Sequence, residues 1–155
     1  MAALKPIKDA HGKECKKPMR TYQIFIDGID KTGKDLIRSY IFYLGKGRYI
    51  CVARGIMSMQ VYSKIYDRKY EYDIEPQKNV MNVLLEVDKE DWEVRCKASN
   101  EQLTDYEAET SEFEKAYENL KSKGCNVLKF NTSLNTPYCI ARAILNEMER
   151  INGQD

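Results

Sequence analysis

The sequence predicts an α/β protein, a three-layer sandwich built on a small parallel sheet of about four strands. Short apolar segments alternate along the chain with segments of helical periodicity, the pattern of a sheet covered by helices. Strands separated by helices pair in parallel through right-handed crossovers. The 155 residues, 43% of them hydrophobic, suit one domain with its own core, and we find neither an internal repeat nor a linker that divides them.

The first half of the chain supplies two strands and two helices. Residues 22–27 read as a strand that runs into a glycine-bounded loop. Residues 34–44 predict a helix with one apolar face that carries Leu36, Ile37, Tyr40, Ile41 and Leu44. After a glycine break, residues 49–53 form a short strand, and residues 57–67 form a second helix.

The second half continues the alternation. Residues 80–87 are the most apolar run and predict a central strand. A short helix over 89–97 and a polar, acidic segment over 98–111 follow. The next helix covers about 111–123 and ends at Gly124, a residue that favours helix C-termini.

The last strand and helix complete the predicted sheet. Residues 125–130 read as the strand, and the helix begins at Thr136 and Pro137, an N-cap residue followed by proline at the first helical position. This helix runs to about Ile151 and turns inward Ala141, Ile144, Leu145 and Met148. Ligands of such folds bind where parallel strands end, which here means 27–34, 53–55, 87–89 and 130–135.

Charge is distributed unevenly along the chain. The net charge is +1, but residues 1–20 hold a net +4 and the other 135 residues a net −3. We expect residues 1–20 to be a basic, disordered N-terminal arm and residues 21–155 to be the folded domain. Such an arm is either a solvated terminus or a contact for nucleic acid or another polyanion.

Other features narrow the class of protein. No apolar run is long enough for a transmembrane helix, and the N-terminus lacks the apolar segment of a signal peptide. We therefore expect a cytoplasmic protein without membrane contact. Five cysteines without a C-x-x-C pair, beside a single histidine, indicate neither a zinc site nor a disulfide framework.

One stretch, FIDGIDKTGKDLI (residues 25–37), carries most of the functional information. It matches the phosphate-binding pattern G-x-x-x-x-G-K-[ST] at Gly28, Gly33 and Lys34, and it lies between a predicted strand and a predicted helix. Backbone N–H groups of the loop would surround a phosphate, the helix N-terminus would add its dipole, and Lys34 would reach the outer phosphate oxygens. Asp35 stands where the pattern has a hydroxyl.

These residues resemble the opening of thymidylate kinases and related deoxynucleoside monophosphate kinases, where a strand with an acidic end runs into G-I-D-x-[ST]-G-K-[ST]. Asp27 and Asp30 match the acidic positions of that group. Three later stretches resemble the second, third and terminal motifs of the family: ARGIMSMQVY, LLEVDKEDWEVRCK and VLKFNTSLNTPYCIARAIL. The resemblance covers about residues 21–150. It is closest to the short bacteriophage versions, which lack much of the segment that is also short here between Leu44 and Tyr49.

The resemblance implies a nucleotide kinase that transfers the γ-phosphate of ATP to a deoxynucleotide with Mg²⁺, in a host cytoplasm if the chain is of phage origin, and it leaves a homodimer open. Arg54 would bind the phosphate of the acceptor, and Arg95 would be a lid cation that neutralises charge in the transition state. Asp30 would lie near the acceptor phosphate and would bind Mg²⁺ together with Asp35. The implied catalytic residues are Lys34, Arg54, Arg95 and Asp30. The implied donor-binding residues are Gly28, Lys31, Thr32, Gly33, Lys34 and Asp35.

Two departures from the family make the phosphate loop degenerate and leave the activity open. Asp35 replaces the hydroxyl that would ligate magnesium, and Ala53 replaces the aspartate of the Asp-Arg pair. A carboxylate binds magnesium, but beside a triphosphate it also adds repulsion. Two alternatives therefore stand beside the kinase. One is a catalytically degenerate scaffold that binds nucleotide or a protein partner, and the other is a kinase of a modified pyrimidine in DNA that uses the basic arm.

Several aromatic side chains suit either core packing or stacking on a nucleobase, namely Tyr62, Tyr66, Tyr70, Tyr72 and Trp92. Helical spacing favours packing for Tyr62 and Tyr66, and packing is also the preferred interpretation for Trp92.

Overall fold

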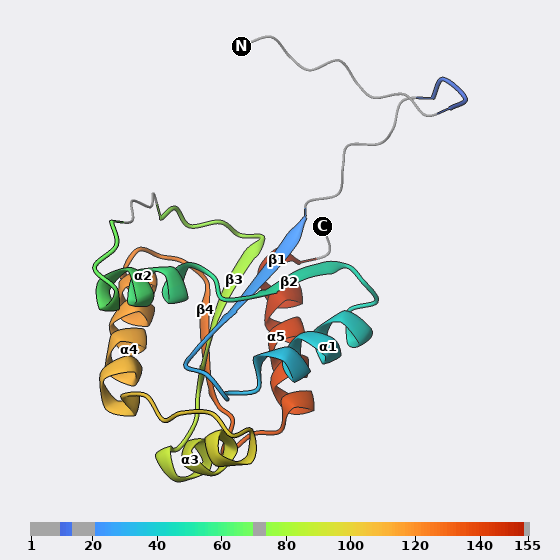
Figure 1. Cartoon of the computed structure of the whole chain (residues 1–155). Helices are drawn as coiled ribbons and strands as arrows, with labels where there is room; N and C mark the ends of the chain where they lie inside the picture. The colour runs from blue at the N-terminus through green and yellow to red at the C-terminus, as the bar shows by residue number, and fades with distance from the viewer. Residues whose placement is uncertain (1–9, 14–20, 70–73, 154–155) are drawn as a thin grey trace.

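The computed structural model of the chain describes residues 10–13, 21–69 and 74–153 (Figure 1). Most of the predicted arm lies outside the described residues, so the arm stays a prediction. No helix in the described ranges is both long and apolar enough to cross a membrane. The elements in these ranges are β1 (Tyr22–Asp27), α1 (Lys34–Leu44), β2 (Tyr49–Ala53), α2 (Ile56–Ile65), β3 (Val80–Glu86), α3 (Lys89–Ala98), α4 (Tyr106–Ser122), β4 (Val127–Asn131) and α5 (Pro137–Asn152).

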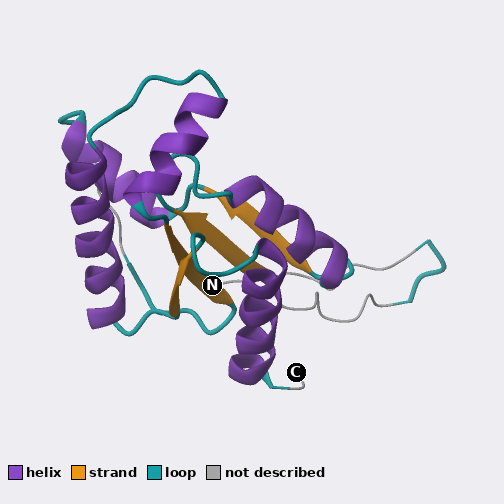
Figure 2. Ribbon diagram, turned by 90° about the horizontal axis from the view of Figure 1, so that it is seen from below, coloured by secondary structure: helices purple, strands orange, loops and turns teal. Residues whose placement is uncertain are grey.

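The strands of the described chain form a parallel sheet in the order β2-β1-β3-β4. Helices α1 and α5 pack on one face of this sheet, and α2 and α4 pack on the other (Figures 1 and 2). This arrangement confirms the predicted three-layer α/β sandwich. Because β1 pairs with both β2 and β3, the loop that follows β1 lies in the middle of the carboxyl edge, where such sheets bind ligands.

Side chains of β1 alternate between the two faces of the sheet, so this strand contributes to the packing on both faces. Ile24 and Ile26 are fully buried in the cluster formed with α1 and α5. Phe25 and Asp27 face the opposite side, where α2 begins. The predicted inward face of the last helix is confirmed, because α5 buries Ala141, Ile144, Leu145 and Met148.

One residue of the predicted apolar face of α1 is placed wrongly. Ile37 and Ile41 are buried, and Tyr40 and Leu44 pack against the same core, but Leu36 is 52% exposed. Leu36 is turned about 100° around the helix from Ile37 and lies at the margin of the apolar stripe. It also belongs to the first turn of α1, which borders a pocket.

The predicted starts of one helix and one strand are wrong, by about five residues and by two residues. Helix α4 begins at Tyr106 instead of about 111, because the Asp105 carboxylate accepts the Ala108 N–H at 3.1 Å and caps the helix. Strand β4 begins at Val127 instead of 125, where its pairing with β3 starts. Neither shift moves the carboxyl ends of the strands that form the site.

Candidate functional site

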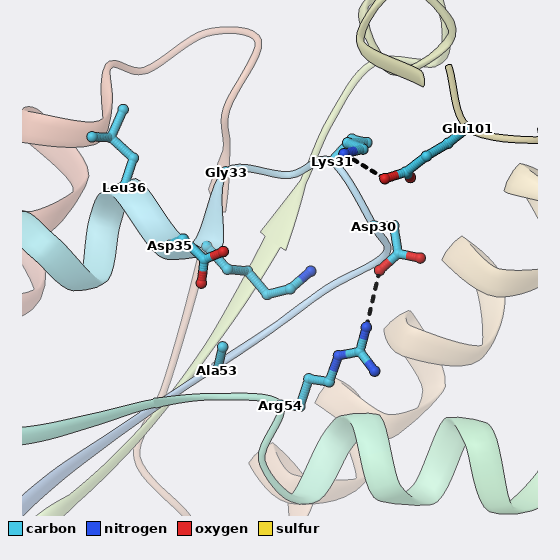
Figure 3. A pocket seen from close by; sticks show the side chains of 9 residues that line it. Asp30, Lys31, Gly33, Asp35, Leu36, Ala53, Arg54 and Glu101 are labelled. Atoms are coloured by element: carbon cyan, nitrogen blue, oxygen red, sulfur yellow. Dashed lines mark hydrogen bonds and ion pairs between the residues drawn. The ribbon is translucent and has the colours of Figure 1, made fainter. Parts of the chain in front are cut away.

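The carboxyl ends of β1 and β2 border a pocket that holds most of the predicted site residues (Figure 3). The volume of this cavity is about 470 Å³. The loop after β1, the first turn of α1, the end of β2 and the segment between α3 and α4 all contribute to it. The lining residues are Asp30, Lys31, Gly33, Lys34, Asp35, Leu36, Ala53, Arg54 and Glu101.

The loop between β1 and α1 has a backbone that restricts which residues it accepts. A Cβ atom at Gly28 would lie only 2.5 Å from the carbonyl oxygen of Leu85 in β3, so the loop and β3 approach too closely for a side chain there. Lys31 and Gly33 have φ of 65° and 91°, and Gly33 is the N-cap of α1, with no side chain capping the helix. Turns of this kind form concave anion sites from backbone N–H groups.

The side chain of Lys34 folds back into this loop. Its Nζ donates to the Gly28 carbonyl at 2.9 Å, the Ile29 carbonyl at 2.7 Å and the Thr32 hydroxyl at 3.2 Å. Burial lowers the pKa of Lys34 to about 8, although the nearby carboxylate of Asp30 acts in the opposite direction. The loop therefore encloses a cation whose charge is disfavoured by burial and would be stabilised by a bound anion.

Two further cations of the pocket are paired with carboxylates, as Figure 3 shows. Arg54 Nη2 lies 3.3 Å from Asp30 Oδ1, and Lys31 Nζ lies 2.7 Å from Glu101 Oε1. Glu101 is a site residue that the sequence does not single out, because it lies in a segment without a motif. An incoming anion would compete with both carboxylates for these cations.

Asp27, which matches an acidic position of the kinase family, has surroundings unlike those of Asp30. The Asp27 carboxylate is fully buried. Its Oδ1 accepts the N–H of Gly55 at 2.7 Å, the N–H of Ser58 at 3.0 Å and the hydroxyl of Ser58. Burial raises the pKa of Asp27, and these hydrogen bonds act against that rise. Asp27 therefore caps the N-terminus of α2 from β1 and is not among the residues that line the pocket.

Asp35 and Ala53, the two departures from the kinase pattern, both line the pocket. The Asp35 side chain is 93% exposed and lies 3.5 Å from the guanidinium of Arg38. Asp30 and Asp35 thus offer accessible carboxylate oxygens to one pocket, and Mg²⁺ commonly completes such a pair with water and phosphate oxygens. No cluster of three His, Cys, Asp or Glu side chains within the described residues would hold a metal alone. Asp30 and Asp35 are therefore the residues of the pocket that could supply carboxylate oxygens to a magnesium ion, with phosphate supplying others.

Arg95 lies beside the loop, outside the residues that line the pocket. Its Nη1 donates to the Lys31 carbonyl at 2.9 Å and contacts the Thr132 hydroxyl at 3.0 Å. The Arg95 side chain therefore connects α3 to the loop between β1 and α1 and to the residue that follows β4. Its role as a lid cation stays a prediction.

Of the aromatic residues considered for stacking on a nucleobase, those in the described ranges contact other side chains. Trp92 is only 3% exposed, so core packing accounts for it. Tyr62 packs against the core between α2 and α4 and stacks on Tyr66, which is itself exposed. Tyr70 and Tyr72 lie outside the described residues.

Comparison with known proteins shows similarity in fold. No protein-family model matches the sequence, and no curated protein sequence matches it. Among solved structures, the chain is similar to the YorR protein from Bacillus subtilis, crystallised in complex with phosphorylated GDP. The TM-score is 0.66 at 14% sequence identity, over 86% of this chain and 99% of that chain. At this low identity the likeness shows a shared α/β fold.

Proposed function

We propose that this chain binds nucleotides through the loop between β1 and α1, and that it is a thymidylate kinase-like phosphotransferase. It would transfer the γ-phosphate of ATP to a deoxynucleoside monophosphate. The observation that carries the proposal is the Lys34 ammonium, enclosed by a glycine loop at the N-terminus of α1 and lining a pocket of about 470 Å³. The nucleotide complex of YorR, a protein of similar fold, supports nucleotide binding. The resemblance to short phage deoxynucleoside monophosphate kinases supports the type of reaction.

In this reaction the protein would position two phosphates and neutralise their charge. Lys34 would exchange its carbonyl partners for oxygens of the donor phosphates, which the loop N–H groups would also bind. Arg54, now paired with Asp30, would bind the phosphate of the acceptor. Arg95 would hold the loop through the Lys31 carbonyl and add positive charge beside it.

Asp30 and Asp35 would hold Mg²⁺, which when bound supplies charge neutralisation at the transferring phosphate. The two carboxylates are now paired with Arg54 at 3.3 Å and with Arg38 at 3.5 Å. Exposed pairs of this kind contribute about 0–1 kcal/mol. A phosphate that brings a metal would therefore separate them easily.

A second candidate function is nucleotide binding without catalysis. Among the described residues that line the pocket, carboxylates and cations are equal in number, which weakens the attraction for a triphosphate. Ala53 also leaves the position before Arg54 without a carboxylate. A protein of this kind would bind nucleotide and would not turn it over.

Isothermal titration with ATP, ADP and the four common deoxynucleoside monophosphates, with and without Mg²⁺, tests the proposal, and a coupled assay then measures ADP formation. We expect Lys34→Ala to weaken ATP binding at least about tenfold in a folded protein, because a charge-assisted contact contributes about 1.5–3 kcal/mol. Lys121→Ala, at an exposed lysine of α4, is the matched control and should bind as the wild type does. Absence of nucleotide binding would contradict the proposal, and binding without turnover would favour the second candidate.

A further inference from the structure

Arg54 has a backbone conformation that its residue type seldom adopts. Its φ of 70° lies in the left-handed region, which favours glycine. Its side chain is 61% exposed, and its ion pair with Asp30, at 3.3 Å, lies at the far end of a long flexible stem. The side chain therefore does not account for the backbone conformation, and the constraint must come from neighbouring chain.

That constraint comes from β1. The N–H of Arg54 donates to the Ile26 carbonyl at 2.9 Å, and the N–H of Gly55 donates to Asp27 Oδ1 at 2.7 Å. The same carboxylate oxygen accepts both the N–H and the hydroxyl of Ser58, in the first turn of α2. Arg54 is thus held between a strand-type backbone bond and a buried carboxylate that also caps α2.

Gly55 shows how closely β1 and the start of α2 approach. A Cβ atom at Gly55 would lie 2.5 Å from the Cβ of Phe25, so no larger residue fits there. Phe25 and Asp27 lie on the same face of β1. Phe25 therefore limits the distance between the two segments, and Asp27 orients the Gly55 N–H. Because α2 has no capping side chain at its own N-cap, the cap comes from Asp27.

The two oxygens of the Asp27 carboxylate differ in their hydrogen bonds. A substitution can therefore remove the negative charge and keep the oxygen that accepts those bonds. All the hydrogen bonds from the start of α2 end on Oδ1. Oδ2 is buried and has no hydrogen-bond partner among the described residues. Burial raises the pKa of this carboxyl, while the hydrogen bonds from Ser58 and Gly55 and the charge of Lys34 act in the opposite direction. Asparagine would keep the Oδ1 acceptor and remove the charge.

We propose that Asp27 is a positioning residue of the site. By holding the N–H of Gly55 and the first turn of α2, it directs the Arg54 guanidinium to the phosphate of the acceptor nucleotide. Ser58 contributes through its N–H and hydroxyl. Asp27 touches no ligand itself, unlike Asp30, which lines the pocket. The inference rests on the proposed nucleotide binding.

The test titrates two ligands into the full-length protein and its variants. One is ADP, which the loop and Lys34 would bind, and the other is the tightest binder among dAMP, dCMP, dGMP and dTMP, whose phosphate Arg54 would bind. Asp27→Ala should weaken binding of the monophosphate by roughly three- to tenfold, and by no more than Arg54→Ala does. It should leave ADP affinity within about twofold. Asp27→Asn should bind both ligands within about twofold of the wild type.

A double variant shows whether Asp27 acts through Arg54. In an Arg54→Ala background, Asp27→Ala should cause no further loss of monophosphate affinity, because the group that it positions is already gone. A further loss there would overturn the inference, as would an Asp27→Asn variant as weak as Asp27→Ala. So would an equal loss for both ligands, which a general structural defect would cause. Asp105→Ala removes the carboxylate cap of α4, outside the pocket, and should leave both affinities unchanged. A monophosphate loss in this control equal to that of Asp27→Ala would overturn the inference as well.

Two further measurements apply if Asp27→Ala does not fold or if no nucleotide binds the wild type. If Asp27→Ala does not fold, Ser58→Ala removes only the hydroxyl bond and should weaken the monophosphate alone, by about threefold. That effect should vanish in the Arg54→Ala background, and its persistence would overturn the inference. If no nucleotide binds the wild type, the proposed function fails. Amide hydrogen exchange of Gly55 and Ser58 then tests whether Asp27 holds the start of α2. Protection lost in Asp27→Ala or Ser58→Ala but kept in Asp27→Asn supports the part of the inference in which Asp27 holds Gly55 and the first turn of α2, and unchanged protection in the alanine variants overturns it.

Discussion

The buried ammonium of Lys34 gives the candidate site a pH dependence. The pKa of Lys34 is lowered to about 8 by burial, so the free protein carries this charge below pH 8 and loses it above. An anion at the loop would raise the pKa again, and binding above pH 8 would then take up a proton. We expect ADP affinity to fall by up to about tenfold per pH unit above pH 8. Titration in buffers of different ionisation enthalpy measures the proton uptake, which Lys34→Ala should abolish. Constant affinity to pH 10 would contradict this assignment.

Asp35 should have opposite effects on the affinity for ATP with and without magnesium. The carboxylate is exposed at the start of α1, where it would repel the phosphates of free ATP. As a ligand of the metal, it would instead attract the magnesium complex. At about 4 Å in water, one unit charge is worth about 1 kcal/mol, or roughly fivefold in affinity. Asp35→Ala should therefore strengthen ATP binding by about that factor without Mg²⁺ and weaken it with Mg²⁺.

Titration of ATP into wild type and Asp35→Ala, with and without Mg²⁺ at matched ionic strength, measures both changes in affinity. Glu118→Ala, which removes an exposed carboxylate of α4, is the control and should change neither affinity by more than about twofold. Stronger binding of Asp35→Ala under both conditions would show that Asp35 is a remnant of lost catalysis and not a metal ligand.

At the scale of elements, the sequence predicts most of the fold because local sequence patterns specify most helices and strands. Apolar periodicity specifies the order of strands and helices, and the two loop glycines correspond to a close approach at Gly28 and a left-handed turn at Gly33. The start of α4 was missed because its cap, Asp105, lies within a uniformly polar segment. Glu101 was missed because its pairing with Lys31 joins distant segments, and no local pattern selects one acidic residue among many.

Asp27 shows a different limit of sequence interpretation. Its match to an acidic family position is visible, and strand alternation places it on the face of Phe25. Its role as the cap of α2 follows only from the crossover that brings Gly55 and Ser58 beside β1. The sequence therefore predicts that Asp27 lies at the carboxyl edge of the sheet. Its contact with the start of α2 depends on the topology of the fold and is not visible in the sequence.

The ion pair between Lys31 and Glu101 couples the loop to the segment between α3 and α4. The pair is 2.7 Å long, and both side chains are partly exposed. An anion at the loop would have to draw Lys31 away from Glu101. We therefore expect Glu101→Gln to raise ADP affinity, by at most about fivefold, because exposed pairs contribute about 0–1 kcal/mol.

The gain should shrink at high salt, which screens the pair. Titrations of ADP at low and high sodium chloride concentration check this, with Glu118→Gln as a control for the change in net charge. A loss of affinity in Glu101→Gln would instead place Glu101 among the residues that bind the ligand or its metal.

At the scale of the whole molecule, a cluster of charges joins α4 to the edge of the sheet formed by β3 and β4. Lys129 Nζ contacts both carboxylate oxygens of Glu114, at 2.8 and 2.7 Å, and lies 4.4 Å from the ring centre of Tyr117. Its distance to Glu86 Oε1 is longer, 3.9 Å, and that oxygen is buried without a hydrogen-bond partner among the described residues. Burial and the adjacent Glu114 raise the pKa of Glu86 to about 7. In the folded chain Glu86 is therefore mostly protonated below about pH 7, well above the pH at which an ordinary Glu loses its proton.

This cluster should make the fold less stable as pH rises toward neutral. Between the usual pKa of Glu, 4.5, and the folded value of about 7, the native chain keeps a proton on Glu86 that the unfolded chain releases. The unfolded state then binds fewer protons, so the free energy of unfolding falls as pH rises through this window. Glu86 is 27% exposed, and solvent reduces the shift of stability to about 1–2 kcal/mol. Glu86→Gln, neutral at every pH, should match the wild type near pH 5 and exceed its stability at pH 8. Urea unfolding of both proteins from pH 5 to pH 8 measures the difference, and parallel pH profiles would show that Glu86 does not hold the proton.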